Sequence, residues 1–364
     1  MSEVLYRKYR PQKFSDVLGQ DHIVSVLEAQ VKSGDISHAY LFSGTRGTGK
    51  TSVARIFAKS IGTTPNDIYE IDAASNTSVD DIRSLNESVN TLPFESKYKV
   101  YILDEVHMLS KSASNALLKT LEEPPAHVVF ILATTETHKI LETILSRCQT
   151  FTFKKPSSEV LKKVVQSVAK KEGFSIESSS ADLIAMLGDG SFRDTLGIVQ
   201  KIITSSPVVE QSSLRGVAKD KNPSSRAKLT TGRGISEEEV LLVTGAPKIE
   251  LVRDVISAIS EKDLEKGLSA VALAKKENID MTVFLKLILH SARAVLLFRF
   301  GSSGVVRDDM SEHEIDFISK IAEKDQNFSS KVLIELLSAL EKTTGAYIPS
   351  LPLELALISI IKNQ

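Results

Sequence analysis

The chain has 364 residues, of which 42% are hydrophobic and 25% charged, so it predicts an ordinary globular protein of two or three domains. Its net charge of −1 confines any DNA-binding surface to a local patch, and its single cysteine, Cys148, excludes an intrachain disulfide and a cysteine-type zinc site. The charged N-terminus lacks the apolar stretch of a signal peptide, and no apolar run approaches the roughly 20 residues that span a bilayer, so we expect a cytoplasmic protein.

The first predicted elements are a helix and a buried strand. Residues 6–20 form a polar and aromatic segment, after which apolar side chains recur at helical spacing between Ile23 and Val31. The short apolar run at 38–43 is typical of a buried strand, and residues 52–59 return to helical spacing. The segment between them therefore connects a strand to a helix.

That connecting segment, Gly-Thr-Arg-Gly-Thr-Gly-Lys-Thr at 44–51, fits the P-loop pattern G-x-x-x-x-G-K-[ST]. Glycines allow the backbone to approach a phosphate group, and the loop N–H groups and the helix N-terminus then face the anion. We expect Lys50 to reach the β- and γ-phosphates and Thr51 to hold Mg²⁺. The alternative is a chance glycine-rich turn, which the flanking strand and helix disfavour. The predicted nucleotide-binding loop consists of Gly44, Thr45, Arg46, Gly47, Thr48, Gly49, Lys50 and Thr51.

Two acidic residues end a later predicted strand. After a short strand at 67–72 and a helix at 79–89, the apolar run 98–105 ends in Asp104 and Glu105. This is the Walker B arrangement, in which Asp104 would hold the magnesium shell and Glu105 would orient and deprotonate the attacking water. A strand that merely ends in surface acids is the alternative, but its position after a P-loop favours the catalytic interpretation.

The next strand, 128–135, ends in two hydroxyl side chains, Thr134 and Thr135. A hydroxyl at the tip of a strand beside a P-loop can sense the γ-phosphate or place water, and it can equally cap the following turn. The sequence does not separate the two threonines. A short helix, Ser146-Arg147-Cys148 and a strand at 151–153 follow, and the alternation of strands and helices predicts a parallel sheet with its ligand at the carboxyl ends of the strands.

The remaining residues are predicted to be mainly helical. Three helices are expected within 160–202, with Arg193 near the start of the third. Residues 206–233 are rich in serine, glycine, proline and basic side chains without a clear period, so we expect a flexible basic insertion. Residues 236–364 show helical spacing and no catalytic constellation, which indicates a packing or assembly domain.

Several of these segments together resemble the bacterial clamp-loader ATPases, the gamma/tau family of DNA polymerase III subunits within the AAA+ class. The resemblance is dense over residues 3–205 and weaker over 234–364. The segments that carry it are 5–11, 44–51, 71–76, 103–109, 115–125 and 145–148. It implies an α/β P-loop NTPase fold with a parallel sheet, followed by an α-helical lid and an α-helical collar. We therefore predict an ATPase domain at 1–155, a lid at 156–245 that contains the insertion, and a collar for oligomerisation at 246–364.

The resemblance also implies roles for residues outside the P-loop. Arg147 would be an arginine finger that enters the ATP site of the neighbouring subunit, and Arg193 would be a sensor that contacts the γ-phosphate in its own subunit. Tyr6, Val17 and Gly19 would lie near the adenine and ribose.

The function that the resemblance implies is ATP-driven opening of a sliding clamp and its loading onto primer-template DNA during replication. The expected cofactors are ATP and Mg²⁺. The expected partners are delta and delta-prime type subunits, the clamp and DNA, in a ring or spiral hetero-oligomer that the resemblance implies is pentameric. DNA phosphates would be contacted by Ser75, Asn76, Thr77, Lys97, Ser110 and Lys111, with little dependence on base sequence.

Three departures from the family pattern qualify these expectations. Residues 61–66 stand where the family commonly carries a four-cysteine zinc module, so we predict no zinc. The segment 206–233 resembles an insertion, and the tail that longer relatives carry after the collar is missing from this sequence. Two alternative functions are a different AAA+ DNA motor, of the branch-migration helicase type, and a clamp-loader adaptor that binds nucleotide poorly.

Overall fold

The computed structural model describes residues 3–75, 79–216, 233–302, 304, 312–324, 328–343 and 345–362, without the side chains of 206–216 and 312–313. The chain divides into two compact units. The first comprises Met1–Val168 and Gly188–Gly197, and the second comprises Ala169–Leu187 and Ile198–Gln364. The three domains predicted from the sequence are not tested by this division and stay a prediction.

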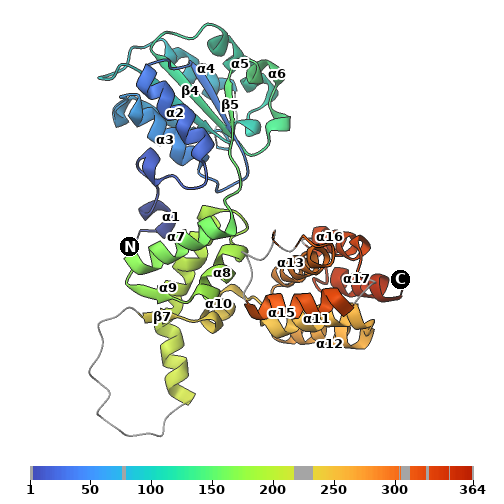
Figure 1. The fold of residues 1–364 in the computed structure, drawn as a ribbon. Coiled ribbons are helices and arrows are strands. Elements are labelled where there is room, and N and C mark those ends of the chain that lie inside the picture. Colours follow the sequence, from blue (N-terminus) through green and yellow to red (C-terminus); the bar gives the residue numbers. More distant parts are fainter. Residues whose placement is uncertain are drawn as a thin grey trace, which may run out of the picture. The chain divides into compact units, whose positions relative to one another are not determined.

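The first unit is built on a five-stranded parallel sheet with strand order β2-β3-β4-β1-β5 (Figure 1). The strands are β1 Ala39–Ser43, β2 Ile68–Asp72, β3 Lys99–Asp104, β4 Val128–Thr134 and β5 Gln149–Thr152. In register, Ser43 lies beside Thr134 and Asp72 lies beside Asp104, so the carboxyl ends of neighbouring strands meet at one edge. The predicted parallel sheet is confirmed, and all five strands lie within a few residues of their predicted positions.

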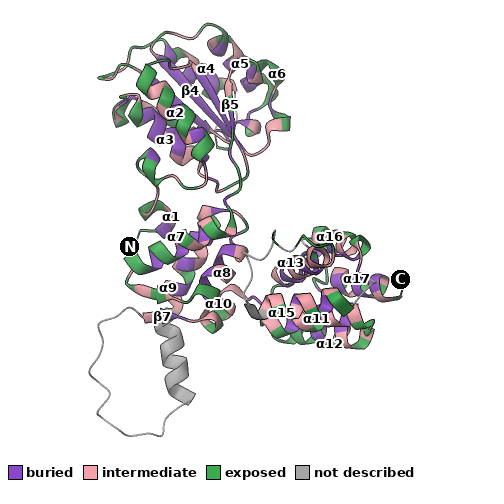
Figure 2. Cartoon of the chain, viewed as in Figure 1, coloured by how far each residue is buried: buried purple, intermediate pink, exposed green. Residues whose placement is uncertain are grey.

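Helices cover both faces of this sheet because side chains alternate along its buried strands. Tyr40 and Phe42 of β1 pack on one face, in a cluster with side chains of α2 and α3, while Leu41 packs on the other face with side chains of α4, α5 and α6. The strands are the most continuously buried part of this unit (Figure 2). Its helices are α1 Leu5–Lys8, α2 Asp21–Ser33, α3 Lys50–Ser60, α4 Val79–Val89, α5 Lys111–Glu122 and α6 Glu142–Leu145, with short 3-10 turns η1 Phe14–Asp16, η2 Pro65–Asp67, η3 Val106–Met108 and η4 Thr137–Lys139.

The segment that follows the sheet contains α7 Ser158–Lys171, β6 Phe174–Ile176, α8 Ser178–Leu187, α9 Phe192–Gly216, β7 Arg233–Ile235 and α10 Glu237–Thr244. The sequence prediction missed the parallel pair of β6 and β7. Strands of three residues are too short to show a period of two, and their partners lie far apart in the chain. Ser236 begins α10 with a capping box that Glu239 completes.

The first part of the segment 206–233, for which the sequence showed no clear period, is helical, because the α9 backbone continues to Gly216; the expected flexibility of this insertion stays a prediction. Extending an existing helix gains one hydrogen bond for each residue fixed, whereas starting a helix is costly. A segment with weak propensity can therefore continue a helix whose earlier turns are anchored by Val199 and Ile202 in the core. Residues 217–232 lie outside the described part of the chain.

The rest of the second unit is mainly helical where the structure describes it, as predicted. A single hydrophobic cluster draws on these described helices: α11 Ile249–Glu261, α12 Leu264–Lys276, α13 Met281–Arg299, α15 Glu312–Lys324, α16 Ser330–Thr343 and α17 Leu351–Lys362. Asp263 and Asp280 cap the starts of α12 and α13 by accepting hydrogen bonds from backbone N–H groups. In the described residues, α13 alone is long and apolar enough to span a membrane, but Phe284, Leu285 and Ile288 place it in this cluster as a core helix.

Candidate nucleotide-binding site

The loop between β1 and α3 is shaped by three glycines. Gly44, Gly47 and Gly49 have φ angles of 146°, 76° and 101°, a region that favours glycine. A Cβ atom would lie 2.7 Å from the Phe153 carbonyl oxygen at Gly44 and 2.0 Å from Ser191 Oγ at Gly47. The P-loop pattern predicts glycines where the backbone approaches phosphate, but close packing within the protein already requires Gly44 and Gly47.

Lys50 lies buried inside this loop at the start of α3. Its Nζ donates to the carbonyl oxygens of Gly44 at 2.8 Å and Thr45 at 3.0 Å. Burial lowers the pKa of Lys50; the carboxylates of Glu105 and Asp104 oppose that shift and the Arg193 guanidinium adds to it. An ammonium group bonded only to carbonyl dipoles is available to an anion that enters the loop.

Thr51 and Asp104 meet across the strand edge. The Thr51 hydroxyl donates to Asp104 Oδ2 at 2.7 Å, so the first turn of α3 touches the end of β3. A hydroxyl and a carboxylate are hard oxygen ligands of the kind that Mg²⁺ prefers. These two residues, which the sequence predicted as metal ligands, therefore fit that ion, while the loop N–H groups and the α3 N-terminus fit phosphate.

Glu105 follows β3 in a left-handed backbone conformation with φ 51° and ψ 44°. Its N–H donates to Asp104 Oδ1 at 3.0 Å, and its carboxylate oxygen Oε2 accepts a hydrogen bond from the Thr135 hydroxyl at 3.1 Å. A non-glycine residue in this region is uncommon, and its presence directly after Asp104 indicates a backbone shaped for the site.

The structure separates the two threonines at the end of β4. Thr134 is fully buried, its hydroxyl accepts from the Glu136 N–H at 3.0 Å, and its carbonyl accepts from the Gly44 N–H at 3.2 Å. Thr135 instead contacts Glu105. Thr134 therefore links strand and loop, while Thr135 alone of the two touches the second acid.

The start of α9 lies against the P-loop. The Phe192 N–H donates to the Gly47 carbonyl at 3.0 Å, and the Arg193 guanidinium lies 5.5 Å from the centre of the Tyr6 ring. Tyr6 therefore lies beside Arg193, whose neighbour Phe192 bonds the loop, and the predicted roles of Tyr6 and Arg193 at the nucleotide stay predictions. Sequence reasoning missed the nearby pair in which Arg55 bonds both carboxylate oxygens of Glu70, at 2.7 and 2.6 Å. Spacing in the sequence gives no sign of that pair, since its members lie on α3 and β2.

Val17 and Gly19 belong to the segment that precedes α2. Val17 is half-buried against the core face that contains β1, and Gly19 has a φ of 70°. The next residue, Gln20, is fully buried and exchanges two hydrogen bonds with the Lys154 backbone, at 2.7 and 3.1 Å. This amide pair fixes the segment beside the end of β5. The predicted role of Val17 and Gly19 near adenine stays a prediction.

Arg147 lies at the end of α6 and is not joined to the P-loop of its own chain by any described contact. Its guanidinium donates to Glu122 Oε1 at 2.6 Å and to the Thr143 carbonyl at 2.7 Å. About a third of its side chain is exposed. The predicted role of Arg147 as an arginine finger stays a prediction.

The residues predicted to contact DNA are exposed where they are described. Ser75 bonds the Asp72 carboxylate at 3.2 Å, Ser110 caps α5 by accepting from the Ala113 N–H, and Lys97 lies 4.9 Å from the centre of the Tyr98 ring. Lys111 is the first residue of α5. Asn76 and Thr77 lie outside the described residues. The structure gives these side chains no shared site.

A glycine loop between β1 and α3, with β4 separating β1 from the acid-tipped strand β3 in a parallel sheet, defines the fold of the AAA+ P-loop ATPases. Solved structures agree with this class. The Thermotoga maritima RuvB Holliday junction branch migration motor superimposes with a TM-score of 0.52 over 70% of this chain and 80% of its own, at 21% identity, which shows a shared fold alone.

Curated relatives of the chain are tau and gamma subunits of DNA polymerase III. DNA polymerase III subunit tau of Bacillus subtilis is 35% identical over 94% of this chain and 59% of its own length. The tau subunit of Escherichia coli is 44% identical over 56% of this chain and 35% of its own, and the gamma subunit of a Buchnera aphidicola strain is 41% identical over 55% and 60%. The profile of a family described as DNA polymerase III, delta subunit matches residues 19–70 and 62–157. The chain is thus similar to the gamma and tau subunits of DNA polymerase III, in agreement with the resemblance, and it spans less than two thirds of the length of each of these relatives.

Proposed function

We propose that this chain is an ATPase subunit of a DNA polymerase III clamp loader, in which ATP binding and hydrolysis drive the loading of a sliding clamp onto primer-template DNA. The observation that carries the proposal is the 2.7 Å contact between Thr51 and Asp104, directly beside the buried Lys50. It brings the metal-binding groups of two separate motifs together. The similarity to tau and gamma subunits supports the clamp-loader context.

The proposed reaction is hydrolysis of ATP to ADP and phosphate. A bond forms between the water oxygen and the γ-phosphorus, the bond from that phosphorus to the bridging oxygen of ADP breaks, and Glu105 takes the proton from the water. Mg²⁺ held through Thr51 and Asp104 would supply positive charge to the phosphates. Lys50 would exchange the Gly44 and Thr45 carbonyls for phosphate oxygens. Thr135 is the better candidate than Thr134 for the sensor on β4, because its hydroxyl already contacts Glu105.

The second basic group of the site is proposed to report on bound nucleotide. Arg193 reaches the P-loop side of the unit from the start of α9, where its charge is close enough to affect the pKa of Lys50. A γ-phosphate would be attracted by both cations, so its loss on hydrolysis would remove a contact to α9. Tyr6, which faces Arg193, would border the nucleotide together with Val17 and Gly19.

The assembly is also part of the proposal. Arg147 of one subunit would complete the ATP site of the neighbouring subunit, where its guanidinium would exchange its contact with Glu122 for a contact with the phosphates. The subunits would form a hetero-oligomer with delta and delta-prime type subunits, and this assembly would bind the clamp and DNA. Clamp and DNA would bind the ATP-dependent arrangement of the subunits more tightly than other arrangements, and they would thereby increase its population. We expect this assembly to be pentameric and cytoplasmic, and DNA to contact Ser75, Asn76, Thr77, Lys97, Ser110 and Lys111 through phosphates.

The test is ATP hydrolysis by the full chain with its companion subunits, measured with and without clamp and primed DNA. Stimulation that requires clamp and primed DNA together is the expected result. Turnover on duplex DNA without clamp would instead identify a DNA motor of another kind. Absence of both nucleotide binding and turnover would identify a non-catalytic adaptor, and either result would overturn the proposal.

A further inference from the structure

A histidine with a largely buried side chain lies between Glu105, the acid that follows β3, and the end of β4. His107 is the middle residue of η3, and its side chain is only 7% exposed. Its Nδ1 lies 3.1 Å from the Thr134 hydroxyl and 3.5 Å from Glu105 Oε2, while its Nε2 lies 3.4 Å from Glu136 Oε1. The imidazole ring therefore contacts three side chains, and only one of them, Glu105, has a role in the proposed hydrolysis.

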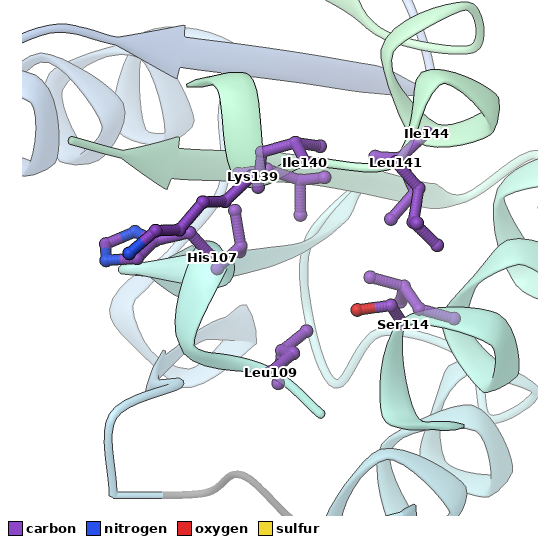
Figure 3. A pocket seen from close by; sticks show the side chains of 10 residues that line it. His107, Leu109, Ser114, Lys139, Ile140, Leu141 and Ile144 are labelled. Atoms are coloured by element: carbon purple, nitrogen blue, oxygen red, sulfur yellow. The ribbon is translucent and has the colours of Figure 1, made fainter. Parts of the chain in front are cut away.

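The Nε2 side of this ring contacts Glu136, which also forms an ion pair with Lys139. Glu136, which contacts Nε2, also pairs with Lys139 Nζ at 2.7 Å and lies 3.7 Å from His138 Nε2. In Figure 3 the His107 and Lys139 side chains lie next to each other, apart from Leu109, Ser114, Leu141 and Ile144 of the same cavity. That cavity of about 20 Å³ has room for a water molecule but for no larger ligand. The ring is thus held by its polar partners beside an apolar wall.

We infer that His107 is a positioning residue that fixes the Glu105 carboxylate for the attacking water. The inference rests on the proposed ATPase function and deepens it. Glu105 is about one-third exposed, and the described side chains that contact its carboxylate are Thr135 and His107. Without the ring, the carboxylate would keep one neighbour and gain rotamers that point away from the P-loop. A misplacement of about 1 Å can cost roughly a hundredfold in rate.

Geometry rather than charge carries the inference. Whichever ring nitrogen holds the proton, the ring lies between Thr134 and Glu136, and its Nδ1 edge faces Glu105. Because Thr134 also bonds the Gly44 N–H through its carbonyl, the same residue joins the P-loop, the histidine and β4. The position of the Glu105 carboxylate is thereby tied to the strand beside the P-loop.

The experiment measures nucleotide affinity and steady-state turnover separately, using the full chain with its loader companions, clamp and primed DNA. In His107→Ala we expect kcat to fall roughly tenfold to a hundredfold while ATP affinity stays unchanged. His138→Ala is the matched control, because His138 also reaches Glu136 but is 76% exposed and has no described contact with Glu105. It should leave both quantities unchanged.

Two further variants keep the inference falsifiable if alanine disturbs folding. His107→Asn retains an amide group near the Nδ1 position and His107→Gln near the Nε2 position, so Asn should restore more of kcat than Gln. In a Glu105→Gln background, His107→Ala should cause no additional loss. An additive loss there, or a parallel fall in ATP affinity, would overturn the inference while leaving the ATPase proposal in place. A wild-type chain without turnover would instead overturn the ATPase proposal and, with it, the inference.

Discussion

Both units contain hydrogen-bonded polar side chains, but these side chains occupy different places in the two units. In the first unit, Lys50 and Thr134 are buried polar side chains whose partners lie on other elements at the carboxyl edge of the sheet. In the cluster of α11 to α17, the core is apolar, and Asp263 and Asp280 use their carboxylates to close helix ends. Buried polar groups are costly unless bonded, and Lys50 and Thr134 have bonded partners within the candidate site.

The left-handed residues show the same contrast. Lys262, with φ 57°, ends α11, and its N–H donates to the Ala258 carbonyl. Glu105, with φ 51°, ends no helix and instead aims a carboxylate beside Asp104. A similar backbone conformation therefore serves a helix end in one unit and a candidate catalytic group in the other. If this comparison is right, substitutions in the first unit can abolish function without unfolding, and those in the second should act through stability.

The largest effect is expected from Lys50→Ala. Removing the buried ammonium should abolish ATP binding in the altered subunit, because the phosphates lose their cation within the loop. Lys59→Ala, an exposed lysine on the same helix, is the control and should bind ATP normally. Fluorescent-nucleotide titration measures binding, and circular dichroism checks folding. A Lys50→Ala chain that bound ATP as the wild type does would remove this residue from the site.

Arg147→Ala should leave ATP binding intact and slow hydrolysis in the assembled loader by about 10³ to 10⁵, the range known for arginine fingers. Arg83→Ala, an exposed arginine paired with Asp80, provides the control. Turnover is compared between the assembly and the isolated chain. If the isolated Arg147→Ala chain lost its basal turnover as completely as the assembly did, the residue would act within its own subunit.

Phe284→Ala tests the other side of the comparison. Phe284 is fully buried in α13, and its truncation should lower the free energy of unfolding of the second unit by about 3–5 kcal/mol. ATP binding by chains that remain folded should be unchanged. Phe300→Ala, with a side chain that is 70% exposed, should have little effect on denaturant midpoints. Loss of ATP affinity in a folded Phe284→Ala chain would show that the units are not energetically separable.

The smallest effect concerns acid stability. Asp67 is buried; burial raises its pKa, but hydrogen bonds from the N–H groups of Glu95, Phe94 and Ser96 outweigh this and hold its pKa at about 2. Because the folded pKa lies below the unfolded one near 4, its stabilisation is complete above pH 4 and lost as the pH falls towards 2.

Asp67→Asn should therefore cost about 1–3 kcal/mol at neutral pH and reduce the loss of stability between pH 4 and 2. Asp316→Asn, in an exposed pair with Lys320, should change little. Urea denaturation at several pH values measures both. Parallel curves for wild type and Asp67→Asn across that range would show that Asp67 does not titrate with folding.

Patterns along the chain predicted the strands, the P-loop and the acids after β3, because burial period and glycine positions are local properties. They did not distinguish Thr134 from Thr135, since both end one strand and only their partners differ. His107 lies in the segment 103–109, which carries the family resemblance, but the sequence predicted no role for it. Its contacts come from β4 and the turn after it, which the sequence of the segment does not reveal. The short pair of β6 and β7 gave no pattern at all. What remained unpredicted depends on partners distant in sequence.

The bonds of Lys50 to the Gly44 and Thr45 carbonyls have a consequence for selectivity. Under the proposed function, an entering ligand must replace the two carbonyl groups as hydrogen-bond acceptors of the Lys50 ammonium group. A polyphosphate replaces them with full negative charges, whereas adenosine offers nothing that the lysine prefers to its present partners. Under the proposed function, the loop would therefore discriminate against nucleosides before any base is recognised.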